Sequence, residues 1–230
     1  MPSFPGPPFP VQLFSFLFGT KPPLIDRSLR RIGEMLDVSA QMFAASTGYL
    51  LDNEPVEVDL SELDDRVNEG EAFVRRAVLE HMVSDPKVET SFSLLLVSIV
   101  QDAERCGDLA KSLAKAAELA TSPRMGDHVE ALRPIRDRVR DMYPRTRRAF
   151  VEGDAAAART VMEEHLQTKD DVAAFLATLA ASDAPTNEAV VLSVGSRMIG
   201  RTSSHLSNII SAVALPFDQV RNAPTWDADR

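Results

Sequence analysis

The sequence predicts an all-α protein built as two tandem three-helix bundles, with six long helices in total. Apolar residues recur at helical spacing almost throughout the chain, and no convincing stretch alternates apolar and polar residues as a half-buried strand does. Asn-Gly and Asp-Gly, the dipeptides most typical of β-hairpin turns, are also absent. Two amphipathic helices followed by a more apolar one occur twice in succession, which indicates a duplicated unit with antiparallel neighbours.

Composition narrows the class of protein. Of the 230 residues, 44% are apolar and 26% are charged, as in ordinary globular proteins. The net charge of -9 argues against nucleic-acid binding, which relies on a basic surface. Residues 1–124 hold 19 acidic and 12 basic residues, so most of the acidic excess lies in the first half. The single cysteine excludes a disulfide framework, and we expect a cytoplasmic protein.

The two ends of the chain are expected to lie outside the bundles. Residues 1–24 are rich in proline and phenylalanine and are predicted to form a flexible arm. The longest apolar run in this arm, over residues 11–18, is far shorter than the ~20 residues that span a bilayer. A basic region is missing before it, so no signal peptide is expected. Residues 217–230 are predicted to form a C-terminal tail.

Residues 25–122 are predicted to form the first bundle, with helices over residues 25–51, 59–83 and 85–121. The segment Asp52–Pro55 ends the first helix. Asp59 and Glu62 form a capping box at the start of the second. The third contains Leu94–Val97, which is apolar on every side and predicts a central, largely buried helix.

Residues 126–216 are predicted to form the second bundle, with helices over residues 128–151, 155–181 and 183–215. Ser122–Gly126 is the clearest internal break before it. Pro134 and Pro144 are expected to kink the fourth helix. Glu152–Asp154 should end that helix and cap the fifth.

Carboxylates on two neighbouring helices form the candidate functional site. Glu104 and Asp108 are four residues apart, so they project from one helix face, one turn apart. Asp64, Asn68 and Glu71 share one face of the preceding helix in the same way. If the two helices pack side by side, these oxygen atoms converge on a site suited to a hard or borderline cation.

Three segments resemble the PhoU family. Residues 102–110 (DAERCGDLA) resemble the family signature (D/E)-L-E-R-I-G-D-x-A. Residues 64–71 (DDRVNEGE) are similar to the D-x-x-I-N-x-L-E segment in the preceding helix. Residues 197–209 (RMIGRTSSHLSNI) look like a worn copy of the second repeat of the signature. The resemblance covers about residues 25–215, and the first signature is its most specific part.

The resemblance implies a regulator of phosphate uptake or phosphate signalling, without enzymatic activity, that contacts a phosphate transporter or a sensor-kinase component. It implies a homodimer that reaches the membrane only through its partner. It also implies a bound metal ion or cluster, of iron or zinc. Carried over to this chain, the metal ligands are expected to be Glu104, Asp108, Asp64, Glu71 and Asn68.

The second repeat departs from the family pattern. Gly200 and Ser204 stand where the family has carboxylates, and Lys169 falls near an expected acidic position. We therefore expect one metal site per chain at most.

Other interpretations of the carboxylates remain open. A helical carboxylate pair is commonly a solvated face, and Asp108 with Lys111 is a candidate surface ion pair. The chain would then be a metal-free helical interaction module. A carboxylate-bound metalloenzyme is a further alternative, disfavoured because no histidine lies beside the carboxylates in the sequence.

Overall fold

The computed structural model describes residues 23–84 and 90–221. Within these ranges the chain forms helices and no strand, which confirms the predicted all-α class. The helices are α2 (Pro23–Leu51), α3 (Leu60–Ser84), α4 (Thr90–Glu118), α5 (Asp127–Glu152), α6 (Ala155–Ala180), α7 (Thr186–Ala214) and the short 3-10 helix η1 (Phe217–Gln219). Residues 1–22, 85–89 and 222–230 are not described, so the predicted arm and most of the predicted tail lie outside the described residues.

Local capping groups explain where several helices begin and end. Asp59 accepts hydrogen bonds from the backbone N–H groups of Ser61 and Glu62, so its predicted capping role is confirmed. Asp154 caps α6 in the same way, through the N–H groups that follow it. Gly153 ends α5 with φ of 72°, a left-handed conformation that glycine adopts without steric cost.

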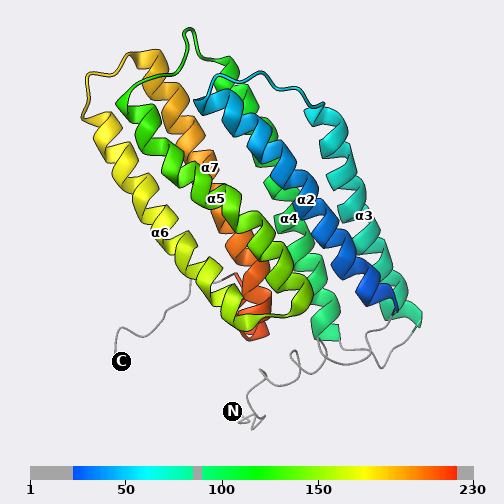
Figure 1. Ribbon diagram of the computed structural model, residues 1–230. Helices are drawn as coiled ribbons and strands as arrows, with labels where there is room; N and C mark the ends of the chain where they lie inside the picture. The colour runs from blue at the N-terminus through cyan, green and yellow to red at the C-terminus, as the bar shows by residue number, and fades with distance from the viewer. Residues whose placement is uncertain (1–22, 85–89, 222–230) are drawn as a thin grey trace, which may run out of the picture.

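The helices lie side by side in an elongated bundle (Figure 1). α3 and α6 form its two edges, and the other four long helices lie between them. α2, α3 and α4 contact one another, as do α5, α6 and α7. The two groups meet along two extended contacts, between α4 and α7 and between α2 and α5, so one continuous apolar core runs through all six helices.

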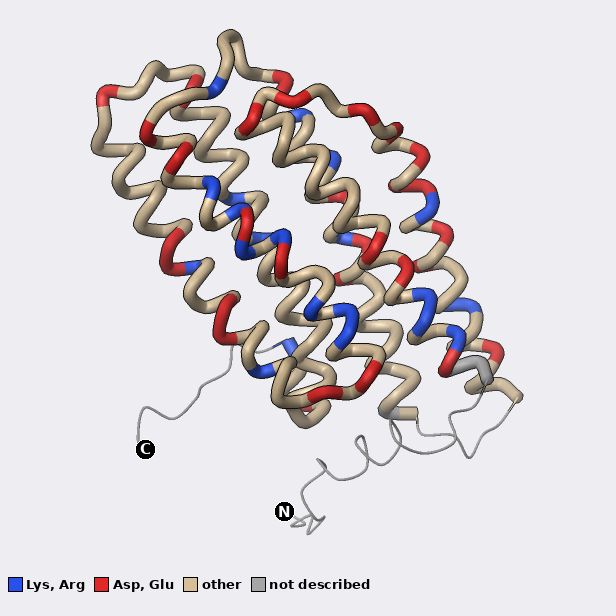
Figure 2. Tube along the Cα trace, in the orientation of Figure 1, with Lys and Arg blue, Asp and Glu red and all other residues tan. Residues whose placement is uncertain are grey.

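Charged contacts also join the two groups of helices. The carboxylate of Asp52, directly after α2, accepts hydrogen bonds from Arg133 Nε at 2.9 Å and Arg136 Nη1 at 2.7 Å, both on α5. Burial raises the pKa of Asp52, but the two guanidinium groups outweigh this effect and lower it below its ordinary value. Figure 2 shows acidic residues gathered along the segment that connects α2 to α3.

Helix α5 continues through both of its prolines, from Asp127 to Glu152, so neither residue ends it. Within the described residues, no helix is both long enough and apolar enough to span a membrane.

The helix that contains Leu94–Val97 is central and largely buried, as predicted, but one of its sides is exposed. Leu94 is 50% exposed and Val97 is 36% exposed. Leu95 and Leu96 are buried in the core. A uniformly apolar run does not reveal which side faces solvent, and the contacts of α4 with α2, α3 and α7 leave one side open. Val190 on α7 is similarly exposed.

The contact between Leu50 of α2 and Gly195 of α7 generates a stability prediction. Leu50 is fully buried, and a Cβ atom at position 195 would lie 2.5 Å from Cδ2 of Leu50. Alanine is favoured over glycine in helices by about 1 kcal/mol. We expect Gly195→Ala nevertheless to lower the free energy of unfolding by about 1–2 kcal/mol, because the core must shift to accept the methyl group. Urea denaturation measures the change.

The control is the same substitution in a Leu50→Ala background, where the obstructing side chain is gone. There Gly195→Ala should stabilise the protein rather than destabilise it. An equal loss in both backgrounds would contradict this account of the contact.

Candidate functional site

Helices α3 and α4 pack closely at the position of the signature segment. Gly107 faces α3, and a Cβ atom there would lie 3.4 Å from Val67 Cγ1 and 3.7 Å from Asp64 Oδ1. An alanine methyl group would just contact Val67 there, so a side chain longer than that of alanine would push the helices apart. Asp64 is itself buried, with 6% of its surface exposed, and faces the signature helix as the sequence predicted.

Lys111 provides an internal cation for this seam. Its Nζ atom lies 2.5 Å from Oδ2 of Asp64 and 3.8 Å from Oδ1 of Asp108, so one ammonium group bridges carboxylates of both helices. Asn68 donates a second hydrogen bond to Asp64 Oδ2 at 3.1 Å. The proposed surface pair of Asp108 with Lys111 thus exists, but the shorter contact of the lysine is with buried Asp64.

Glu104 is the carboxylate with the most perturbed electrostatics. Burial, the negative charge of Asp108 and that of Glu71 together raise its pKa to about 7, although Arg105 opposes the shift. Arg105 lies 2.9 Å from Asp108 and 3.6 Å from Glu104, and Arg75 lies 2.8 Å from Glu71. Glu104 therefore exchanges its proton near neutral pH, in a site where added positive charge would favour the ionised form.

The structure brings together most of the residues predicted from sequence. Glu104, Asp108 and Glu71 interact electrostatically, Asp64 is linked to Asp108 through Lys111, and Asn68 lies at the solvent-exposed edge, bonded to Asp64. Among the described residues, no three His, Cys, Asp or Glu side chains are arranged so that they could hold a metal ion. The metal site therefore stays a prediction.

The sequence analysis quoted Asp102 as part of the signature but gave it no role. Its side chain is 1% exposed, and its carboxylate lies 2.8 Å from Nδ1 of His205 and accepts a hydrogen bond from Asn208 at 3.0 Å. Nε of Arg221, which follows η1, lies 3.2 Å away. The signature segment of α4 (residues 102–110) is thus hydrogen-bonded to the similar segment of α7 (residues 197–209). The sequence offered only an acidic residue in the first copy and a histidine and an asparagine in the second as candidate partners.

The fold and the seam together define a class: all-α bundle proteins in which a repeated three-helix unit presents polar groups between facing helices. Comparison with known proteins places the chain within this class. Residues 32–117, from α2 to the end of α4, match the family model described as the PhoU domain. Over these residues the chain is similar to the PhoU domain, as the signature segments predicted.

Solved structures show the same fold over nearly the whole chain. PhoU from Pseudomonas aeruginosa is 19% identical, with 88% of this chain and 94% of that chain covered and a TM-score of 0.63. The phosphate transport system regulatory protein PhoU from Streptococcus pneumoniae is 15% identical, with 95% of this chain and 99% of that chain covered and a TM-score of 0.67. A comparison with curated proteins finds no match.

The raised pKa of Glu104 predicts that the ionisation of this residue lowers the stability of the folded protein, the opposite of what an ion-paired carboxylate does. The folded-state pKa of about 7 exceeds the ordinary value of 4.5, so the folded protein binds this proton more tightly than the unfolded chain. Stability is therefore lost as the pH rises from 4.5 to 7. We expect Glu104→Gln to raise the free energy of unfolding at pH 8 by about 1 kcal/mol, allowing for solvent screening. Urea denaturation at pH 8 and at pH 4.5 measures the difference.

Glu69→Gln, at an exposed position on α3, removes the same charge outside the seam and serves as the control. If Glu104→Gln gave no more stabilisation at pH 8 than this control, the repulsion assigned to the seam would be refuted.

Proposed function

We propose that the protein regulates phosphate uptake or phosphate signalling by binding other proteins, without chemistry of its own. The observation that carries the proposal is the match of residues 32–117 to the PhoU domain, within a fold that is similar to solved PhoU structures over 88% and 95% of this chain. One of the structurally similar proteins is described as a phosphate transport system regulatory protein. We propose that this chain acts in the cytoplasm as a homodimer, on a phosphate transporter or a sensor-kinase component.

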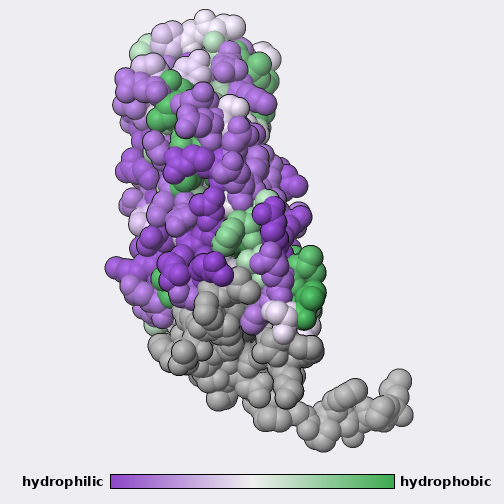
Figure 3. All heavy atoms as spheres, turned by 90° about the vertical axis from the view of Figure 1, so that its right-hand side faces the viewer, coloured by the Kyte–Doolittle hydropathy of each residue, from purple (hydrophilic) through white to green (hydrophobic). Residues whose placement is uncertain are grey.

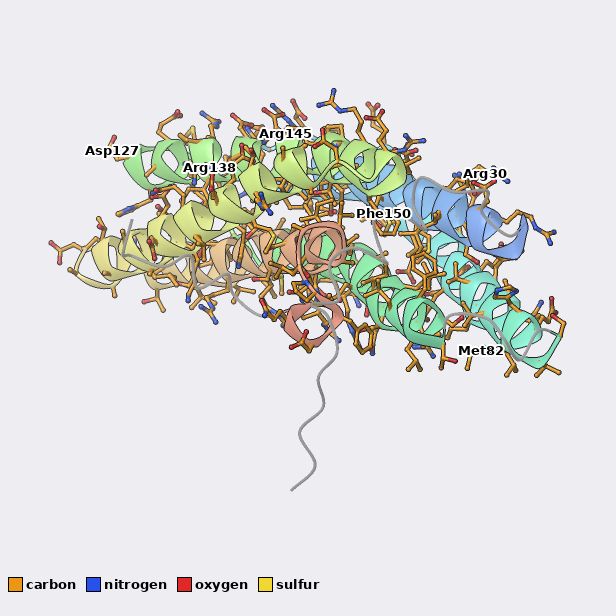
Figure 4. The ribbon with its side chains drawn as sticks, turned by 90° about the horizontal axis from the view of Figure 1, so that it is seen from below. Arg30, Met82, Asp127, Arg138, Arg145 and Phe150 are labelled. Carbon is orange, nitrogen blue, oxygen red and sulfur yellow. The ribbon has the colours of Figure 1, made fainter. Side chains whose placement is uncertain are left out.

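An exposed apolar patch supports action through protein contact. Its members lie near the end of α3 and the start of α4, two helices that pack against each other: Leu79, Met82, Val83, Leu94 and Val97. Figure 3 shows apolar side chains near the lower end of the face that α3 presents, and Figure 4 shows Met82 near the end of α3. Exposed apolar groups gathered in this way are typical of binding surfaces.

We also propose that the acidic seam binds one divalent metal ion once Glu104, Asp108 and Glu71 rearrange around it, since these side chains are not placed to hold an ion in the structure. The oxygen donors suit a hard or borderline cation, and the raised pKa of Glu104 reflects a repulsion that a cation would relieve. Arg105, Arg75 and Lys111 neutralise these carboxylates in the structure, so the metal would compete with them. A metal-free module in which Lys111 permanently replaces the metal is the second candidate function, favoured by its bridge between the two helices.

The partner surface is tested by affinity capture from the native host, grown with and without phosphate starvation. Wild-type protein should retain subunits of a phosphate transporter or a sensor kinase, identified by mass spectrometry. We expect Val83→Ser combined with Leu94→Ser to reduce the captured amount by about tenfold, as for residues central to an interface. Leu119→Ser combined with Met125→Ser, at exposed apolar positions outside the patch, should capture as much as the wild type.

Capture of no phosphate-related protein by the wild type would overturn the regulatory role. Equal capture by both double variants would leave that role standing and remove the patch as its surface. If the patch is instead the dimer contact, light scattering will show the Val83→Ser, Leu94→Ser variant alone as a monomer.

The metal is tested by elemental analysis of freshly purified protein at pH 8. We expect about one equivalent of transition metal, reduced about tenfold by Glu104→Gln with Asp108→Asn. Lys111→Gln should increase the affinity for added metal, because the competing ammonium group is gone.

Asp65→Asn with Glu69→Gln removes two exposed negative charges from α3 and controls for net charge. Wild-type protein without metal, and without affinity for added zinc or iron, would favour the metal-free module.

A further inference from the structure

The second bundle contains a cationic cavity at the position that corresponds to the acidic seam of the first. The cavity has a volume of about 310 Å³ and lies between α6 and α7. Its lining consists of His165, Lys169, Val172, Arg197, Gly200, Arg201 and Ser204. The lining therefore includes three basic side chains and a histidine, and none of its members is acidic.

The two sites correspond residue by residue. In the first bundle Gly107 faces Asp64, and Glu104 interacts with Glu71. In the second bundle Ser203 occupies the position of Gly107 and lies 2.9 Å from Nδ1 of His165, which therefore corresponds to Asp64.

A Cβ atom at position 200 would lie 3.4 Å from Cγ2 of Val172. Val172 therefore corresponds to Glu71, and Gly200 corresponds to Glu104. By the same alignment Lys169 corresponds to Asn68, and Ser204 to Asp108. Each carboxylate of the seam has thus been replaced by a neutral or basic residue.

These replacements account for both the space and the charge. Gly200 and Ser204 occupy less volume than the glutamate and aspartate at the corresponding positions of α4, which leaves room between the helices. A volume of about 310 Å³ equals that of roughly ten water molecules in the liquid. The cavity is large enough for one phosphate group with bound water, or for two linked phosphate groups.

The basic side chains of the cavity are exposed to solvent, and no carboxylate of the described residues neutralises them. Lys169, Arg197 and Arg201 form no ion pair with a carboxylate in the described part of the chain. Two carboxylates of α6 that could have neutralised these cations pair with arginines of α5 instead. Asp171 pairs with Arg138 at 2.6 Å, and Glu164 pairs with Arg145. Figure 4 shows both arginines on α5. This arrangement is notable in a chain of net charge -9.

We propose that this cavity binds a phosphate group, with Arg197, Arg201 and Lys169 as the charged ligands and Ser204 as a hydroxyl donor. Arginine guanidinium groups match the oxygen spacing of phosphate, and lysine adds a compact charge. The inference goes beyond the regulatory role and stands without it. Inorganic phosphate, a diphosphate and a phosphate monoester all share the chemistry that the lining recognises.

The test is isothermal titration of the full-length protein at pH 7.5 and constant ionic strength, with inorganic phosphate, diphosphate and glycerol phosphate in separate experiments. We expect saturable binding of at least one of them, with about one site per chain. Arg197→Gln combined with Arg201→Gln should weaken that binding by about tenfold or more. The compound that binds most tightly identifies the form of the phosphate group that the cavity prefers: inorganic phosphate, diphosphate or a monoester.

Two further variants keep the result interpretable. Arg76→Gln with Arg148→Gln removes two exposed arginines outside the cavity and should bind as the wild type does. Ser204→Asp restores the acidic residue of the first bundle and should abolish binding through repulsion, with the helical content unchanged by circular dichroism. Absence of saturable binding of all three compounds to the wild type would overturn the proposal. Equal weakening by the cavity pair and the control pair would also overturn it, because the attraction would then be nonspecific.

Discussion

The contact between α4 and α7 is the constraint on which the rest of the structure depends. Each of these helices is the third of its bundle, and their long contact merges two apolar interiors into one core. Leu96 and Ile99 of α4 line the same small apolar space as Ala212 and Val213 of α7. Without this contact each bundle would present an apolar helix face to water, at a cost proportional to the exposed area. The acidic seam and the cationic cavity therefore lie on opposite flanks of a shared, rigid centre.

The helical layout could be predicted from the sequence because its signals are local. Asp59, Gly153 and Asp154 act within a few residues of where they stand, so the described helices begin and end close to the expected positions. Exposure of Leu94 and Val97 could not be predicted in this way. Which side of an apolar helix faces water depends on how many neighbours surround it, and that number is set by the whole fold.

The candidate site was predictable in part, for the same reason. Helical spacing placed Glu104 with Asp108, and the family pattern placed both opposite Asp64 and Glu71. The contact of Lys111 with Asp64 was not accessible, because a flexible side chain with four methylene groups can reach several partners. The cavity of the second bundle was equally hidden, because loss of the metal-ligand pattern at Gly200 and Ser204 gives no indication of what replaces it.

Asp102 has a consequence for how the two repeats can diverge. Its carboxylate is almost fully enclosed, and its partners His205 and Asn208 belong to the other repeat. An isolated substitution at any of these positions leaves a polar group without its partner in a dry environment. We expect these three positions to tolerate exchange as a set better than one at a time. The two halves of the chain are thus held to each other by an enclosed polar contact as well as by the apolar core, even where the surfaces between their outer helices differ in charge.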